Sequence, residues 1–265
     1  MSHLISGSRI VPVYFNACEE LLQQRCQCFN LVLEIAEPNI QTPQDRASIN
    51  EVSTALVDNN CSSITTVANT IFPQQLYDRS GYPGVYGRFD AVISRFKKKG
   101  TWGTYFQRLT AFPGKNGKPI NQLELAIYKL LRSVNGKYFS SIYELNVSGI
   151  GTVDMDLGTE LLLYSPHNEG RKISNMPCMS HLSLKLDRTV NRLHLTAVYR
   201  SQYYGSKALG NLIGLARLQK FICDQIDGIQ PGVMTCIATE ARLDVEALGG
   251  MARSRTLLLN NGNNP

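Results

Sequence analysis

Three polar residues whose side chains could take part in a reaction or bind a ligand stand where apolar segments of the chain begin or end. Cys178 directly precedes an alternating apolar segment, and Arg200 and Ser201 close the next one. A cysteine thiolate adds to electrophilic carbon, and an arginine matches the oxygens of a phosphate with parallel hydrogen bonds. A fourth residue, Asn211, lies among the leucines of a long apolar segment and offers both a donor and an acceptor. Together these groups suit a phosphorylated ligand that bears an amide.

Each of these residues also has an ordinary structural explanation. A cysteine before a strand is commonly a core or inert surface residue, and an arginine at a strand end commonly forms an ion pair. An asparagine near a helix start can act as a cap. Taken one at a time, the residues indicate only an α+β domain that binds phosphate.

The elements that would position these residues are clearest in the C-terminal third. The segments "HLSLKLD" and "RLHLTAVYRS" alternate with period two around the turn "DRTVN", which predicts a β-hairpin. His181, Ser183 and Lys185 share one face of it, and three leucines share the other. The segment "ALGNLIGLARLQKFICDQIDG" is apolar nearly all round, which predicts a buried core helix ended by Gly228. A further strand, "GVMTCIATEARLD", follows.

The rest of the chain is less regular. We expect helices over 16–28, 46–58, 86–98 and 120–134, strands over 29–38, 62–73 and 137–147, and a loop over 78–87. Thr42 or Asp45 is the expected cap of the second helix. The predicted class is therefore α+β, with a mixed or antiparallel sheet packed on one long buried helix.

Composition narrows the function. The 265 residues carry a net charge of +6, which favours anionic partners, but no nucleic-acid motif is present. We find neither a membrane-spanning segment nor a secretory leader, so we expect a cytoplasmic protein. The seven cysteines include no C-x-x-C pair, which favours reduced thiols and no metal site.

The order and spacing of these pieces resemble thymidylate synthase and its hydroxymethylase relatives. In that family the pattern is Pro-Cys-His, a hairpin, Gln-Arg-Ser, and then Leu-Gly-x-Pro-Phe-Asn entering a core helix. The matching pieces here are "MPCMSHLSLKL", "LTAVYRSQYY" and "KALGNLIGLARL". Upstream, "TYFQRLTAFPGKNGKPINQL" resembles a family stretch that carries a tyrosine.

The resemblance implies one domain over 1–265 with the thymidylate synthase fold. The match covers 85–245, after a divergent N-terminal region over 1–84. Residues 149–176 would be an insertion, and 253–265 a flexible tail.

The resemblance also implies a reaction on a pyrimidine nucleoside monophosphate. Cys178 would attack C6 of the base, and C5 would accept a one-carbon unit from 5,10-methylenetetrahydrofolate. Arg200 and Ser201 would bind the 5′-phosphate, and Asn211 would recognise the base. Tyr105 matches a family tyrosine near the C5 proton.

Further roles follow from weaker matches. Lys137 falls where the family reaches the phosphate of a partner subunit, so a homodimer is expected. Arg242 and Asp244 fall at the positions that hold the sugar, and Tyr203 falls where the family's pterin contact lies. Asp90 is the carboxylate nearest to the place expected for the family's general acid.

Several departures from the family pattern leave alternatives open. The expected general-acid position is Ile93, and Met179 stands where the family has histidine. The chain is then either a methylase or hydroxymethylase of a uracil or cytosine nucleotide, with ribose or deoxyribose, or a nucleotide-binding homologue without catalysis. An unrelated α+β protein is the third alternative.

Overall fold

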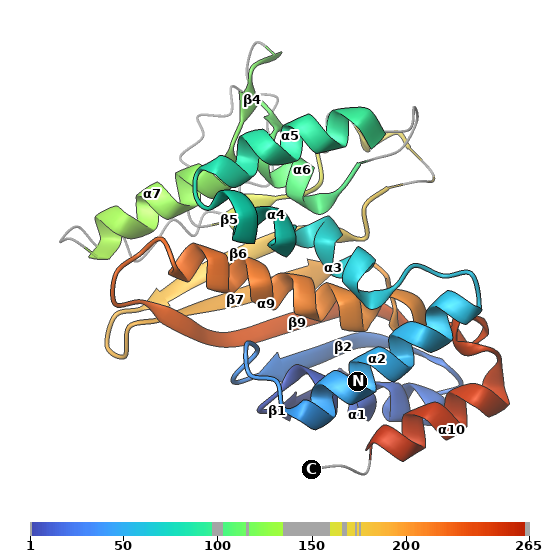
Figure 1. Cartoon of the computed structure of the whole chain (residues 1–265). Helices are drawn as coiled ribbons and strands as arrows, with labels where there is room; N and C mark the ends of the chain where they lie inside the picture. The colour runs from blue at the N-terminus through green and yellow to red at the C-terminus, as the bar shows by residue number, and fades with distance from the viewer. Residues whose placement is uncertain are drawn as a thin grey trace.

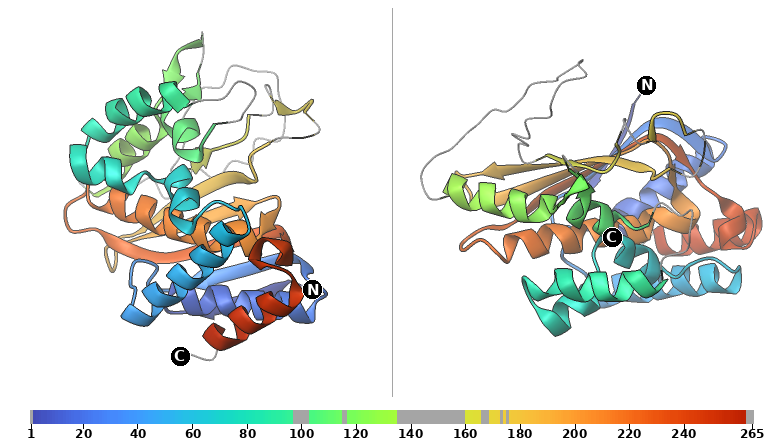
Figure 2. Two further views of the ribbon diagram at one scale, coloured as in Figure 1. Left: turned by 45° about the vertical axis from the view of Figure 1, so that its right-hand side comes forward. Right: turned by 90° about the horizontal axis from the view of Figure 1, so that it is seen from above.

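A mixed β-sheet runs through the molecule, and helices cover one of its faces. Figure 1 shows the computed structural model, and the view from above in Figure 2 shows the helices gathered on one side of the strands. The structure describes residues 2–96, 103–114, 117–134, 160–165, 169–172, 174 and 176–262.

The main sheet has the strand order β1-β2-β9-β7-β6-β5, with the short β8 paired to β9. Its strands are β1 (His3–Gly7), β2 (Gln27–Ile35), β5 (Glu160–Leu162), β6 (Met179–Asp187), β7 (Arg192–Tyr199), β8 (Gln202–Tyr203) and β9 (Gln230–Arg242). A separate small ladder joins β3 (Phe112–Pro113) and β4 (Pro119–Ile120). Because β2 pairs with β9, the N-terminal region belongs to the same sheet as the C-terminal third.

The helices lie before, between and after these strands. They are α1 (Ile10–Gln23), α2 (Pro43–Asp58), α3 (Ile64–Ile71), α4 (Gln74–Ser80), α5 (Gly84–Phe96), α6 (Tyr105–Thr110), α7 (Gln122–Val134), η2 (Tyr204–Ala208), α9 (Leu209–Cys223), η3 (Val245–Leu248) and α10 (Met251–Gly262). None of the helices in the described part of the chain is long and apolar enough to cross a membrane.

The predicted hairpin is confirmed as β6 and β7, which pair antiparallel. Leu182 and Leu184 are fully buried, whereas His181 and Ser183 point to the other face and stay half-exposed. Both β1 with β2 and β7 with β9 run parallel, so the sheet is mixed. The α+β class is therefore confirmed.

The predicted core helix is confirmed as α9, in which nearly every side chain is buried. Gly210 and Gly214 let α3 pack closely against it: a Cβ on Gly210 would lie 2.6 Å from the Val67 Cβ, and one on Gly214 would lie 2.8 Å from the Ala68 carbonyl oxygen. The helix ends earlier than predicted, at Cys223, so Gly228 lies in the turn before β9.

The strand predicted over 62–73 is wrong, because this segment forms α3. Its buried residues are Ile64, Val67, Ala68 and Ile71, which recur at the spacing of one helix face. The Ser63 side chain accepts a hydrogen bond from the Thr66 N–H and caps the helix. The β-branched composition indicated a strand. The segment is a helix instead, because packing against α9 buries residues that recur at helical spacing.

Other boundaries also moved. The first helix begins at Ile10 and ends at Gln23, because β2 already starts at Gln27. The expected loop over 78–87 shrinks to three residues between α4 and α5. Residues 253–262 of the tail expected to be flexible instead form most of α10, which packs against α1. Of the two residues expected to cap α2, Thr42 is the N-cap, and Asp45 completes a capping box with it.

Some predictions cannot be compared with the structure. The strand expected over 137–147 and most of the insertion expected over 149–176 lie outside the described residues. All seven cysteines are described, and each is a free thiol.

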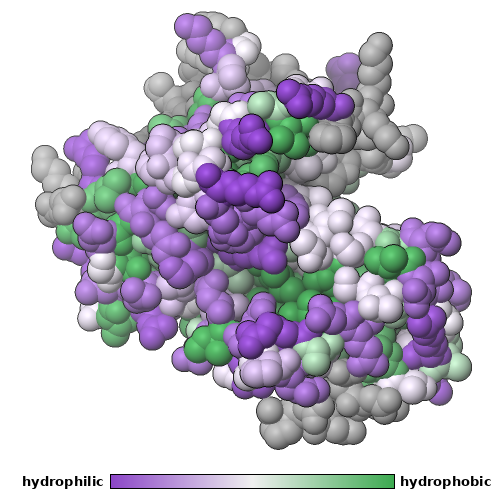
Figure 3. Space-filling view, in the orientation of Figure 1, coloured by the Kyte–Doolittle hydropathy of each residue, from purple (hydrophilic) through white to green (hydrophobic). Residues whose placement is uncertain are grey.

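Figure 3 shows that the helix-covered side is largely hydrophilic, with apolar side chains gathered in the middle of the face.

Candidate active site

Cys178 and Arg200 face each other across the open end of the β6–β7 hairpin. The Arg200 N–H donates to the Cys178 carbonyl oxygen at 2.9 Å, one position beyond the paired residues Met179 and Tyr199. The Thr239 hydroxyl donates to the Arg200 carbonyl oxygen at 2.7 Å, which ties this strand end to β9. The two residues that the sequence singled out are therefore neighbours through the register of the hairpin.

Tyr105 reaches the same place from α6. Its hydroxyl accepts a hydrogen bond from the Met179 N–H at 3.2 Å, directly beside Cys178. Burial raises the pKa of Tyr105 to about 12, so the side chain is a neutral hydroxyl at physiological pH. The Thr104 side chain caps α6 through the Gln107 N–H and so fixes where the helix starts.

The thiol of Cys178 is half-buried, and its surroundings shift its pKa in opposite directions. Burial raises its pKa, because the thiolate loses its hydration, while the positive charges of Arg200 and then Lys207 lower it. The net shift is upward. Lys207 lies on η2, and sequence reasoning missed it although it stands inside the quoted segment "KALGNLIGLARL".

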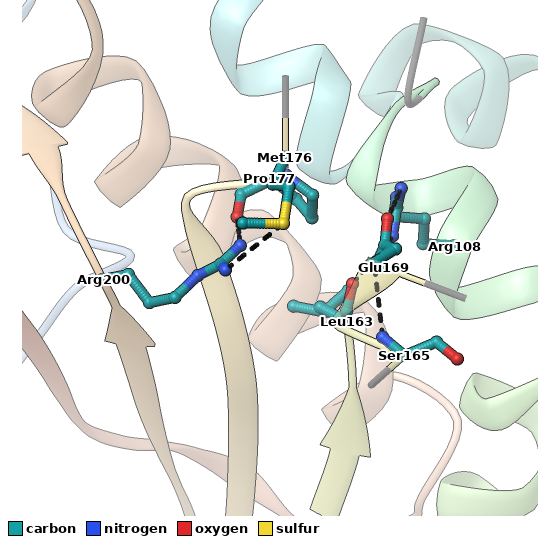
Figure 4. A network of polar contacts seen from close by, with 7 residues as sticks. All are labelled: Arg108, Leu163, Ser165, Glu169, Met176, Pro177 and Arg200. Atoms are coloured by element: carbon teal, nitrogen blue, oxygen red, sulfur yellow. Dashed lines mark hydrogen bonds and ion pairs between the residues drawn. The ribbon is translucent and has the colours of Figure 1, made fainter. Parts of the chain in front are cut away.

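The Arg200 guanidinium is held by neutral groups (Figure 4). Its Nη2 donates to the Pro177 carbonyl oxygen, its Nη1 contacts the Met176 sulfur at 3.8 Å, and the Tyr164 ring centroid lies 4.7 Å from its Cζ. The Nε is buried and has no partner among the described residues. The arginine therefore keeps a positive charge that no carboxylate balances in the described part of the chain.

A second arginine, Arg108, lies close by and is fully paired (Figure 4). Its two Nη atoms bind the two carboxylate oxygens of Glu169 at 2.6 and 3.1 Å, and Nη1 also donates to the Leu163 carbonyl oxygen at 3.0 Å. Burial alone would raise the pKa of Glu169, but the bonds from Arg108 and the Ser165 N–H outweigh it, so the pKa is lowered. The sequence had not indicated this pair, because its members are 61 positions apart.

Asn211 lies in the first turn of α9, beside Gly210. Its side chain is only 5 % exposed, and it has no hydrogen-bonding partner among the described residues. Its amide is therefore a group that water or a ligand could bind. Ser201, just after β7, is half-buried and has no partner in the described ranges either.

Two of the expected sugar contacts have structural partners of their own. Oδ1 of Asp244 accepts hydrogen bonds from the Gly205 N–H at 2.7 Å and the Ser206 N–H at 3.2 Å. This carboxylate therefore caps the turn that leads into α9. Arg242 is exposed and donates from Nε to Glu240 at 2.7 Å. Neither residue needs a ligand to explain its position.

The remaining expected site residues are not brought to Cys178 by any contact that the structure records. Asp90 is exposed on α5 and makes no hydrogen bond or ion pair with a described residue. Lys137 lies outside the described residues. The helix that packs beside Asn211 is α3, which contains no carboxylate in its sequence "ITTVANTI".

Tyr203 is the residue that was expected to contact the pterin of a folate. It is 41 % exposed on β8, and its strand partner Arg242 is already paired with Glu240. We therefore derive no chemical step through a folate.

The chain is similar to three archaeal proteins that each bear the name "Putative thymidylate synthase". The proteins from Methanosarcina mazei and Methanosarcina barkeri are 27 % identical to it over 140 residues, and the one from Methanococcoides burtonii is 28 % identical over 141. Each match covers 53 % of this chain and 52 % of the relative, so it spans about half the length of each protein. No family profile matches the chain. This similarity supports a distant relationship to thymidylate synthase-like proteins.

Proposed function

We propose that this chain transfers a one-carbon group to C5 of a pyrimidine nucleoside monophosphate, with Cys178 as covalent nucleophile. The observation that carries the proposal is the thiol itself. It is half-buried at a strand end, within reach of the charges of Arg200 and Lys207, and next to the hydrogen-bonded hydroxyl of Tyr105. The similarity to proteins named as thymidylate synthases supports the choice of a pyrimidine.

The proposed reaction begins with addition of the thiolate to C6 of the base. The electrons of the C5–C6 double bond move toward C4, onto the C4 oxygen of uracil or N3 of cytosine, so that C5 becomes nucleophilic and bonds to an electrophile. Loss of the original C5 proton and departure of the thiolate from C6 restore the double bond. With a proton as the electrophile the outcome is hydrogen exchange at C5. With a one-carbon donor, the bond between the donor and its one-carbon unit breaks, the donor leaves with the electrons of that bond, and the outcome is transfer.

Each residue has a defined part in this scheme. Asn211, which is nearly buried, would hold the base edge through its amide, which donates to one atom and accepts from the next. Arg200 and Ser201 would bind the phosphate. Tyr105, neutral because its pKa is raised, would relay the C5 proton through its hydroxyl. The one-carbon donor, and the choice between methyl and hydroxymethyl product, are left to experiment.

A nucleotide-binding protein without catalysis is the second candidate. One observation favours it: burial raises the pKa of Cys178, so the thiol is mostly protonated at neutral pH before any ligand binds. The exposed position of Asp90 points the same way, because that residue was the expected source of a catalytic carboxylate.

Tritium release separates the two candidates. The protein is incubated with C5-tritiated UMP, dUMP, CMP and dCMP, with and without methylenetetrahydrofolate, and tritium in the water is counted. We expect release with at least one nucleotide, abolished by Cys178→Ala and unchanged by Cys61→Ala, a half-buried cysteine before α3. Nucleotide binding without release would establish the second candidate. Neither binding nor release would refute both.

A homodimer is part of the proposal, and the sheet face that no described helix covers supports it (Figure 2). Half-exposed aliphatic side chains lie on this face, among them Val32, Val198 and Ile237. A second copy of the chain would bury them. By light scattering we expect a dimer that Ile237→Glu dissociates, whereas Tyr128→Glu, at an exposed position of α7, leaves it intact. A monomeric wild-type protein would contradict this part of the proposal.

A further inference from the structure

A β-bulge interrupts the start of the β6–β7 hairpin. From His181 onward the two strands pair in one continuous register, in which His181 faces Val198. At Met179 the register shifts by one residue, so that Met179 faces Tyr199 and Ser180 is skipped. Ser180 is therefore the extra residue of a bulge. Such bulges occur often beside active sites, because they change the direction of the neighbouring side chains.

The shift decides which residue faces the expected nucleophile. If the register of the rest of the hairpin continued, Cys178 would face Ser201. With Ser180 as the extra residue it faces Arg200 instead, and the Arg200 N–H donates to the Cys178 carbonyl oxygen at 2.9 Å. Because side chains alternate along a strand, the register without a bulge would also put Cys178 on the side of Leu182, which is fully buried. In the structure the cysteine stays half-buried.

Three hydrogen bonds hold the bulge in this form. The Ser180 hydroxyl donates to the Val198 carbonyl oxygen at 3.2 Å. The Ser180 carbonyl oxygen accepts from the Leu163 N–H, also at 3.2 Å. One position earlier, the Met179 N–H donates to the Tyr105 hydroxyl at 3.2 Å. The Ser180 hydroxyl is the one group of the extra residue that a substitution can remove without changing the backbone.

We propose that Ser180 is a positioning residue for Cys178, because its hydroxyl fixes the bulge that sets the cysteine opposite Arg200. The charge of Arg200 acts on the thiol from this position and favours the thiolate, the form that adds to carbon. The place of Ser180 in the hairpin stands on the register and the hydrogen bonds alone. Its effect on catalysis rests on the proposed function.

Alkylation of Cys178 by iodoacetamide, followed by mass spectrometry over a range of pH, tests this role without a nucleotide. Among the described residues, the titratable groups that act on or feel the thiol are Arg200, Lys207, Tyr105 and Tyr199. Ser180→Ala changes none of them, so a shift of the pH profile reports on the position of the thiol. We expect the midpoint to rise by at least about half a pH unit, because the thiol loses part of the influence of the Arg200 charge.

Matched variants separate the hydroxyl from the shape of the side chain. Ser180→Thr and Ser180→Val introduce side chains of nearly the same size, and only the first keeps a hydroxyl. Ser180→Thr should therefore give the wild-type midpoint, and Ser180→Val the midpoint of Ser180→Ala. Ser183→Ala, at a regular paired position of β6, is the control and should leave the midpoint unchanged. Urea denaturation checks that each variant is folded.

A double-mutant cycle shows whether the effect passes through Arg200. In the Arg200→Ala background, Ser180→Ala should leave the midpoint unchanged, because the charge on which the effect depends is already gone. An equal shift in both backgrounds, or a wild-type midpoint in Ser180→Val, would overturn the proposal.

Nucleotide assays connect the position of the thiol to the proposed reaction. With a nucleotide that supports tritium release, the kcat of Ser180→Ala should fall at least about threefold, the loss of thiolate that half a pH unit represents. Affinity measured by calorimetry should stay within about twofold of wild type. A shifted alkylation profile without tritium release from any variant would keep the positioning role and reject the proposed reaction. Tritium release with the kcat and the alkylation profile of Ser180→Ala both unchanged would reject the role of Ser180 and keep the reaction.

Discussion

Two arginines flank the same stretch of chain around β5 and differ in whether their described partners balance their charge (Figure 4). Arg108 is neutralised by Glu169 through two charge-assisted bonds and is further held by a backbone carbonyl. Arg200 touches a sulfur, a carbonyl oxygen and an aromatic ring, none of which carries a charge. The described partners of one arginine complete its charge balance, and those of the other leave it open.

This difference separates a structural ion pair from a binding group. A buried arginine that lacks a counter-charge is expensive unless solvent or a ligand provides one. Arg200 is half-buried, its Nε finds no described partner, and it faces Cys178, whose thiol also feels the charge of Lys207. We therefore expect mutations of the Arg108–Glu169 pair to change the free energy of unfolding, and mutations of Arg200 to change ligand affinity.

The largest effect is expected from breaking the ion pair between Arg108 and Glu169. Glu169→Ala leaves the Arg108 guanidinium buried without its counter-charge, so the free energy of unfolding should fall by about 3 kcal/mol. Urea denaturation followed by circular dichroism measures it. Glu160→Ala, which removes an exposed carboxylate on β5, should change the value by less than about 1 kcal/mol. Equal losses in the two variants would show that the Arg108–Glu169 pair is not special.

The second-largest effect is expected from removing the side chain of Arg200. Arg200→Ala should weaken nucleotide binding by about 2 kcal/mol, or roughly 30-fold, because the phosphate loses a charged donor. The free energy of unfolding should change by less than about 1 kcal/mol, since the lost contacts are with neutral groups. Arg192→Ala, an exposed arginine at the far end of β7, serves as control in the same titration. Undiminished affinity in Arg200→Ala would remove this residue from the site.

A pH titration sharpens the same contrast. The pKa of Glu169 is lowered in the folded protein, so its ion pair contributes fully above the ordinary carboxyl pKa of about 4.3 and is lost as the pH falls through the folded value. The free energy of unfolding should therefore fall on acidification below about pH 5. Glu169→Ala should flatten this dependence, and Arg200→Ala should retain it. An unchanged slope in Glu169→Ala would contradict the assignment.

The smallest effect is expected from the ring that covers Arg200. Tyr164→Leu removes a cation–π contact worth about 0.5–1 kcal/mol and frees the guanidinium to turn toward a ligand. We expect a small loss of stability and unchanged or slightly tighter monophosphate binding, measured by the same calorimetry. A large loss of binding would mean that Tyr164 holds Arg200 in its binding orientation. Tyr128→Leu on α7 is the matched control.

The sequence by itself determined the elements whose patterns are local. The period-two hairpin, the all-apolar helix α9 and the cap of α2 could be predicted, because alternation, helical periodicity and caps depend on residues within one or two turns of chain. Cys178 and Arg200 were both singled out from the sequence, but only the register of the hairpin in the structure shows that they face each other. The nature of α3 did not follow, because its residues suit a strand until α9 offers them a helical partner.

Only the tertiary structure decided what each polar group meets. Nothing near Arg108 in sequence indicates Glu169, and nothing near Asp244 indicates the N–H groups of Gly205 and Ser206, 39 and 38 positions away. The expectation of a sugar contact at Asp244 came from position alone, whereas the fold uses that carboxylate as a cap. Lys207, whose charge acts on the Cys178 thiol, went unnoticed because a lone lysine carries no local pattern. Charge balance depends on three-dimensional proximity, which local sequence patterns do not encode.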